Sequence, residues 1–228
     1  MLSDNAILDL QVLNAAAHNS VPLFLYVSGA LVYDAGVPIP TREEESVSGI
    51  PTEDCKGTVW AKRIGEKAVE YFIEERNMKI AVARLSNVYG PRDDFGLETS
   101  HLIGNVIRAV ANGAPPEIWG DGTPTRSYLY VSDAVRALLL LAELGANKGP
   151  VNICSQHEYT VRQIVDRILE ASGARVEPIY RPGPWGASRR RLDTGKLHAL
   201  TGFTETVDLR EGIRQTVEWF RANRPRLE

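Results

Sequence analysis

A few side chains along the 228-residue chain are of types that could take part in chemistry. Cys55 and Cys154 lie far apart without metal-ligand spacing, so we interpret both as small apolar side chains of a reduced protein. Lys62 precedes Glu66 by about one helical turn, which permits an ion pair worth roughly a few tenths of a kcal/mol. His101 stands at an expected helix start, where it could cap the helix or pack against the preceding loop.

Arginines form the second group of candidates. Arg126 follows the turn at 121–124, and residues 181–191 are rich in Arg, Pro and Gly and end in three arginines. An arginine after a turn is usually a surface charge, and the run at 189–191 could be no more than a solvated loop. Its composition also suits a loop on the ligand side of the molecule.

Composition limits the possible partners. The chain is 43% hydrophobic and 24% charged, which fits a compact protein of one or two lobes with a sizeable core. A net charge of -3 and a pI near 5.9 give no basic field for nucleic acid or a membrane surface, whereas small anionic ligands remain possible. Apolar runs are too short to cross a bilayer and no signal peptide is recognisable, so we expect a cytoplasmic protein.

Apolar periodicity predicts the elements that position these residues. Residues 5–17 form an amphipathic pattern with Ser3 or Asp4 as the expected cap, and 23–28 is a short continuous apolar run. The alternation of helix and strand, with right-handed crossovers, predicts a parallel α/β sheet. Helices are expected at 5–17, 58–76, 100–111, 132–144, 160–171 with Thr160 as cap, 196–200 and a last one through Trp219, and strands at 23–28, 79–84, 117–119 and 151–154.

Six segments of the chain match a known family in sequence and in order. They are 5–33 with Phe24-Leu-Tyr-Val-Ser-Gly-Ala-Leu-Val-Tyr33, Lys62 with Glu66, Arg84-Leu-Ser-Asn-Val-Tyr-Gly-Pro-Arg92, 119–133, Val151-Asn-Ile, and 193–203 with 209–219. Together they resemble the extended short-chain dehydrogenase/reductase (NAD-dependent epimerase/dehydratase) family, in its nucleotide-sugar epimerase/reductase group. Stretches 93–95, 100–103 and 119–126 look most like the GDP-fucose synthase group, whose members epimerise and then reduce a GDP-4-keto sugar with NADPH.

The resemblance implies an incomplete doubly wound Rossmann-type sheet with a smaller C-terminal α/β substrate lobe. The dinucleotide-binding remnant would comprise 1–90 plus 149–172, and the substrate lobe 91–148 plus 173–228. The implied cofactor is NAD(P). The glycines never fall as G-x-G-x-x-G between a strand and a helix, so we expect no cradle for the adenosine half of that cofactor.

The positions that match the family's catalytic residues are substituted. The family uses a Ser or Thr at the strand end and a Tyr four residues before a Lys, and these positions are Gly29, Thr58 and Lys62. The resemblance assigns Lys62 to a nicotinamide ribose. A threonine hydroxyl is too weak an acid to replace a phenol of pKa about 10. Ser28 is adjacent to Gly29 but is expected on the opposite face of the strand.

GDP-fucose synthases also use a Cys and a His as an acid/base pair for epimerisation. The Cys position is Leu31 here, while the His is present as His101. The family's dehydratases use an Asp-Glu pair that would fall on Ala30 and Leu31, so dehydratase chemistry is not expected either.

On the substrate side, the residues that the family uses are present in this sequence. Asn87 matches a residue that contacts substrate near the sugar, and Arg126 matches the arginine that pairs with the nucleotide diphosphate. Arg191, or Arg189, could supply a second arginine. The guanidinium fork suits this role because it donates two parallel charge-assisted hydrogen bonds to phosphate oxygens.

Three functions follow as alternatives. The chain could be a nucleotide-sugar-binding pseudoenzyme deficient in ordinary hydride transfer, an active epimerase or reductase with altered chemistry that uses Lys62 and His101, or a vestigial structural subunit. In the second alternative a partner chain could supply the cofactor half. We also expect an oligomer, either a homodimer through helices 5–17 and 58–76 or a complex with a complementing chain at the 23–28 strand edge.

Overall fold

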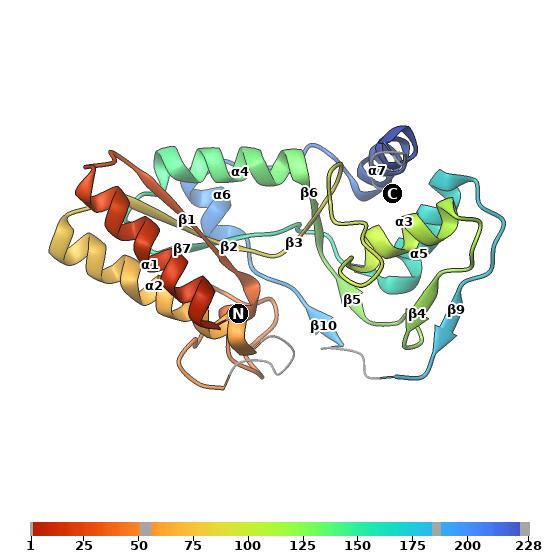
Figure 1. Cartoon of the computed structure of the whole chain (residues 1–228), viewed down its shortest axis with the longest axis horizontal. Coiled ribbons are helices and arrows are strands. Elements are labelled where there is room, and N and C mark those ends of the chain that lie inside the picture. The colour runs from red at the N-terminus through yellow and green to blue at the C-terminus, as the bar shows by residue number, and fades with distance from the viewer. Residues whose placement is uncertain (1, 51–55, 184–187, 224–228) are drawn as a thin grey trace. The chain divides into compact units, whose positions relative to one another are not determined.

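The computed structural model describes residues 2–50, 56–183 and 188–223. The chain divides into two compact units, which we describe separately (Figure 1). Unit 1 contains residues 1–86, 134–154 and 191–204. Unit 2 contains residues 87–133, 155–190 and 205–228.

Unit 1 is built on a three-stranded parallel sheet in the order β1-β2-β7. The middle strand β2 is buried along most of its length because its neighbours flank it on both sides. Helix α2 packs on β1 and β2 and also against α1, while α6 packs on β7. The elements are α1 (Leu2–His18), β1 (Phe24–Gly29), the 3-10 turn η1 (Ala30–Val32), α2 (Lys56–Arg76), β2 (Ile80–Leu85), most of α4 (Val131–Leu144), β7 (Pro150–Ile153) and α6 (Gly195–Thr201).

Unit 2 consists of short strand pairs around three packed helices. Strands β3 and β6 are parallel, as are β4 and β9, and β5 lies between parallel β10 and antiparallel β8. Helix α5 packs on α3 and α7, and the buried side chains of these helices form the core. The elements are β3 (Asn87–Tyr89), α3 (Leu102–Ala111), β4 (Glu117–Trp119), β5 (Thr125–Arg126), β6 (Tyr128–Tyr130), β8 (Tyr159–Thr160), α5 (Val161–Ser172), β9 (Ile179–Arg181), β10 (Arg189–Arg190) and α7 (Leu209–Asn223).

The predicted parallel α/β architecture is confirmed, and the predicted elements differ from the observed ones by a few residues at their ends. The structure also has short strands that the sequence did not predict, at 87–89, 125–126, 128–130, 159–160, 179–181 and 189–190. The first helix already includes Leu2, so neither Ser3 nor Asp4 is its cap. Thr160 does cap α5, through a reciprocal capping box with Gln163. Residues 134–148 fall in unit 1 and 155–172 in unit 2, because α5 packs on α3 and α7 instead of on the three-stranded sheet.

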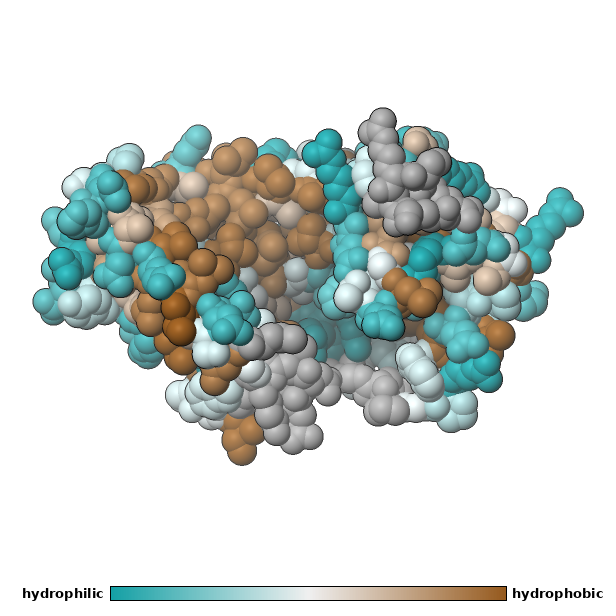
Figure 2. All heavy atoms as spheres, in the orientation of Figure 1, coloured by the Kyte–Doolittle hydropathy of each residue, from teal (hydrophilic) through white to brown (hydrophobic). Residues whose placement is uncertain are grey.

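Apolar side chains are also exposed on the surface of unit 1. Figure 2 shows them over α1 and α4. They include Leu8, Val12, Val135 and Leu139, and Val27 on β1 is exposed as well. Strand β1 pairs with β2 only, so within the described residues its other edge carries no ladder. None of the described helices is long and apolar enough to cross a membrane.

Candidate functional site

Gly29 ends β1 at the position where the family resemblance places a hydroxyl. Its backbone is extended, with φ -142° and ψ 158°, a conformation that any residue adopts. A Cβ added there would meet only the Leu85 carbonyl oxygen, at 3.8 Å. Ser28 lies on the opposite face, in register with Arg84, and its buried hydroxyl has no hydrogen-bond partner among the described residues. The strand end therefore has room for a hydroxyl side chain but does not present one.

Lys62 lies one turn after Thr58 on α2 and turns toward α1. Its Nζ is 3.4 Å from Asp9 Oδ2 and 5.0 Å from the centre of the Tyr26 ring. The expected ion pair between Lys62 and Glu66 does not form. Glu66 instead binds the guanidinium of Arg84 in a two-bond contact of 2.7 and 3.1 Å, since a guanidinium only 4% exposed requires a carboxylate partner.

Tyr26 is the tyrosine beside Lys62, but it is enclosed by α1 and α2. Its hydroxyl donates a 2.7 Å hydrogen bond to Asp9 Oδ2, and the residue is 4% exposed. Burial, followed by the hydrogen bond and charge of Asp9, raises the pKa of Tyr26 far above its ordinary value. The phenol also fills the space beside Gly65, where a Cβ would lie 1.8 Å from the Tyr26 oxygen. Tyr26 therefore cannot exchange a proton with a ligand at the strand end.

The arginines of unit 2 form a different arrangement. Arg126 on β5 is in register with Arg190 on β10, and parallel strands place such side chains next to each other on one face. Both are half-buried. Within the described residues neither forms an ion pair, and Arg126 donates only to the Thr125 carbonyl oxygen, at 2.7 Å. Burial, and then the positive charge of Arg190, lower the pKa of Arg126 from its ordinary value. Among the described residues the pair is therefore a concentrated positive charge that no carboxylate binds.

Neutral polar groups lie on the next strands of unit 2. Asn87 on β3 is in register with Tyr128 on β6, and its Nδ2 donates to the Ser127 carbonyl oxygen at 3.1 Å. Burial raises the pKa of Tyr128 to about 12, the positive charge of Arg126 opposes that rise, and Asp93 adds to it. The phenol is therefore uncharged near neutral pH and can donate a hydrogen bond.

His101 precedes α3 and is exposed. It occupies the N-cap position of α3, but its side chain makes no capping hydrogen bond, so of the two structural roles expected for it the side-chain cap does not form. Burial raises the pKa of the Asp93 carboxyl, while the hydrogen bond from the Asp94 N–H and then the nearby His101 imidazole oppose that rise. Leu31, at the position of the family's cysteine, lies in η1 of unit 1 and has no group that could transfer a proton.

The three consecutive arginines differ in their surroundings. Arg189 binds Glu158, with its closest contact at 2.6 Å, and Arg191 belongs to unit 1. Arg190 is the member opposite Arg126, and sequence reasoning did not single it out. No sequence signal could have done so, because the register of a two-residue strand decides which arginine faces β5. Residues 184–187 of the predicted ligand-side loop, and Cys55, lie outside the described residues. The part of the chain that is described holds no group of His, Cys, Asp and Glu side chains suited to a metal.

A parallel sheet with crossover helices and a second compact unit define the chain as an α/β protein, and comparison with known proteins identifies the family. The profile of the NAD dependent epimerase/dehydratase family matches residues 1–154, so the chain belongs to that family. The predicted resemblance to GDP-fucose synthases is confirmed. The chain is 27% identical to GDP-L-fucose synthase of Escherichia coli over 98% of this chain and 74% of that protein. It is 30% identical to the putative GDP-L-fucose synthase 2 of rice, over 96% of this chain and 65% of that protein.

Solved structures agree on the fold. UDP-glucose 4-epimerase from Thermotoga maritima, solved with UDP-glucose, has a TM-score of 0.88 and 32% identity, with 96% of this chain and 70% of that chain covered. A GDP-L-fucose synthetase from Naegleria fowleri bound to NADP also has a TM-score of 0.88, at 22% identity, with 98% of this chain and 74% of that chain covered.

Proposed function

We propose that the protein binds a nucleotide-diphosphate sugar through unit 2 and does not carry out hydride transfer by the family's ordinary route. The observation that carries the proposal is the register pair of Arg126 and Arg190 on β5 and β10. Two half-buried cations side by side repel each other, so the arrangement favours an anion that bridges them. A diphosphate offers oxygens at the spacing that guanidinium forks bind well.

The sugar would lie toward Asn87 and Tyr128, which are in register on β3 and β6. An amide and an uncharged phenol are suited to sugar hydroxyls because they donate and accept hydrogen bonds without adding charge. The relatives that match the chain act on nucleotide sugars by name, and one solved neighbour contains UDP-glucose.

The deficiency in hydride transfer rests on three positions in unit 1. Gly29 has no hydroxyl, and Thr58 replaces the phenol that would exchange the proton. Lys62, which would hold the nicotinamide ribose, is engaged by Asp9 on α1. These residues do not fit the nicotinamide arrangement that the family's NAD(P) implies.

Calorimetry tests the proposal directly. We expect UDP-glucose or GDP-fucose to bind the wild-type protein, and Arg126→Met and Arg190→Met each to weaken binding by about tenfold or more, since a charge-assisted hydrogen bond contributes roughly 1.5–3 kcal/mol. Arg210→Met is the matched control, because Arg210 is an exposed arginine of unit 2 that already pairs with Glu170. Failure of all GDP- and UDP-sugars to bind would refute the binding role. Tight NADPH binding or NADPH oxidation would refute the deficiency.

A further inference from the structure

The strands that carry the proposed anion site of unit 2 pair over a short distance. Strands β5 and β10 share a register of two residues each, with Arg190 opposite Arg126. A shift of one residue would turn each side chain of β10 to the other face of the strand pair, so that Arg190 would leave the face of Arg126. The run of three arginines at 189–191 offers such alternatives. A side-chain contact that belongs to one register alone would therefore select Arg190.

Glu158 makes such a contact. It directly precedes β8, which pairs with β5 on the side away from β10. Its carboxylate accepts a 3.0 Å hydrogen bond from Thr125 Oγ1 on β5, and bonds of 2.9 and 2.6 Å from Nε and Nη2 of Arg189 on β10. Thr125 and Arg189 are themselves in register. One carboxylate thus binds both members of the register pair that directly precedes Arg126 and Arg190.

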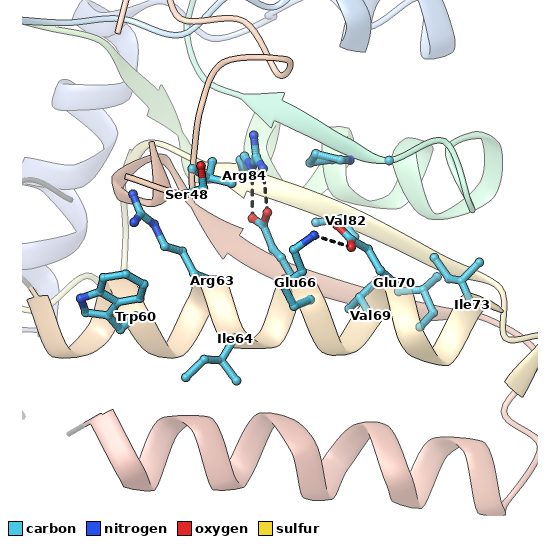
Figure 3. Close-up of a pocket in the computed structure, with 15 residues that line it drawn as sticks. Ser48, Trp60, Arg63, Ile64, Glu66, Val69, Glu70, Ile73, Val82 and Arg84 are labelled. Atoms are coloured by element: carbon cyan, nitrogen blue, oxygen red, sulfur yellow. Dashed lines mark hydrogen bonds and ion pairs between the residues drawn. The ribbon is translucent and has the colours of Figure 1, made fainter. Parts of the chain in front are cut away.

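The contact between Glu158 and Arg189 fixes orientation as well as distance. The two carboxylate oxygens bind Nε and Nη2 of one guanidinium side by side, which adds geometric specificity to the attraction of opposite charges. Figure 3 shows the same arrangement in unit 1, where Glu66 binds Arg84. The Glu158 side chain is 16% exposed, and a largely buried carboxylate is costly unless donors bind it. A one-residue shift of β10 would carry Arg189 to the other face and take the guanidinium away from this carboxylate.

Glu158 and the anion site lie on opposite faces of the small sheet. Side chains alternate along a strand, so Glu158 is on the face opposite to its neighbour Tyr159, which is in register with Arg126. Arg126 and Arg190 share the face of Tyr159. Glu158 therefore holds β10 on β5 without occupying the two guanidinium groups that would bind the ligand.

We propose that Glu158 is a positioning residue that selects Arg190 as the partner of Arg126 for the anion. The proposal rests on the anion-binding role proposed for unit 2. Charge alone predicts that loss of a carboxylate near two arginines strengthens the binding of an anion. A positioning role predicts the opposite, because Arg190 is no longer held on the face of Arg126 once Glu158 is neutral.

Calorimetry with UDP-glucose separates these two outcomes. Glu158→Gln should weaken binding by about three- to tenfold, approaching the loss expected for removal of the Arg190 contact itself. Arg190→Met should then cost less in the Glu158→Gln protein than in the wild type, since the two residues act as one unit. Glu117→Gln is the matched control, because it removes a carboxylate that binds Arg181 between β4 and β9 of the same unit. This control should not weaken binding.

The register can also be followed without a ligand. The Thr125 N–H donates to the Ser188 carbonyl oxygen at 3.0 Å, a bond that belongs to the described register, and its hydrogen exchange is measured by NMR. Glu158→Gln should speed exchange at this amide by about threefold or more. The Ile179 N–H, which donates to the Pro116 carbonyl oxygen elsewhere in unit 2, should exchange at the wild-type rate.

The outcomes distinguish this proposal from the binding role on which it rests. If UDP-glucose binding depends on Arg126 and Arg190 but is unchanged or stronger in Glu158→Gln, the positioning role is wrong and the binding role stands. Unchanged exchange at Thr125, or equal acceleration at Thr125 and Ile179, overturns the positioning role as well, because the effect is then absent or not local. If no nucleotide sugar binds the wild-type protein, the binding role fails and the exchange rates alone decide whether Glu158 selects the register.

Discussion

Two glycines in unit 1 illustrate opposite reasons for lacking a side chain. At Gly29 the backbone is extended and a Cβ would have 3.8 Å to its nearest neighbour, so packing does not select glycine. At Gly65 a Cβ would lie 1.8 Å from the Tyr26 oxygen, and the phenol is fixed by its bond to Asp9. Packing therefore requires glycine at position 65. At position 29 a larger side chain would fit, so glycine leaves the strand end without a hydroxyl for no packing reason.

This contrast gives a prediction for stability. Gly29→Ser should change the free energy of unfolding by less than about 1 kcal/mol, because its side chain enters open space. Gly65→Ala should cost about 2–3 kcal/mol, as for an overpacked core. Urea unfolding at neutral pH measures both values. Equal effects of the two substitutions would show that the contact between α2 and Tyr26 is not as close as described.

At the scale of elements, α2 is tied to the loop that follows β1. Arg63 on α2 binds the Val32 and Gly49 carbonyl oxygens and the Asp34 carboxylate. Burial opposes ionisation of Asp34, but hydrogen bonds from Ser46, from the Gly49 N–H and from Arg63 outweigh it and lower its pKa. Helix and loop are therefore joined by two bonds to backbone carbonyl oxygens and by one ionised carboxyl group, and only the last of these depends on pH.

The pH dependence of folding stability follows from the direction of the Asp34 pKa shift. The folded pKa of Asp34 lies below the unfolded value of about 3.9, so its stabilisation is fully present above about pH 4–5 and is lost as the pH falls through the folded pKa. Asp34→Asn should reduce the free energy of unfolding at pH 7, and the two proteins should converge at the lowest pH at which they remain folded. Urea unfolding across pH gives the two curves, with Glu74→Gln on the exposed side of α2 as control. Parallel curves would contradict the role of the carboxylate.

Elements were easier to predict than contacts between them. Apolar periodicity gave α2 and β2 to within a few residues, because local spacing carries that signal. The same reasoning paired Lys62 with Glu66, since both lie on one helix. In the structure Lys62 pairs with Asp9 and Glu66 pairs with Arg84. These partners are remote in sequence, and a local pattern does not encode contacts between remote residues. The choice of Arg190 over its neighbours depended on strand register in the same way.

At the scale of the whole molecule, large apolar side chains are exposed on helices α1 and α2 of unit 1. Helices α1 and α2 pack together and expose Leu8, Val12, Ile64 and Tyr71, each more than 40% exposed. We propose that a second copy of the chain covers these helices. The unpaired edge of β1 offers a second surface, suited to a strand from a complementing chain.

Light scattering at micromolar concentration tests the homodimer. Wild-type protein should have twice the mass of the chain, and Leu8→Glu or Ile64→Glu should shift it to monomer because a buried unpaired carboxylate is costly. Leu139→Glu, on α4, should leave the mass unchanged. A monodisperse wild-type monomer would exclude this interface.

The arginine pair has a consequence for the strands that carry it. Strand β10 pairs with β5 through only two residues. The positive charges of Arg126 and Arg190 repel each other and so weaken this pairing. An anion that bridges Arg126 and Arg190 removes this repulsion, so binding and strand pairing favour each other. Thermodynamic reciprocity then requires that anything which tightens β10 onto β5 raises the affinity for the anion by the same factor. Occupancy of the arginine pair and pairing of β10 with β5 should therefore rise together.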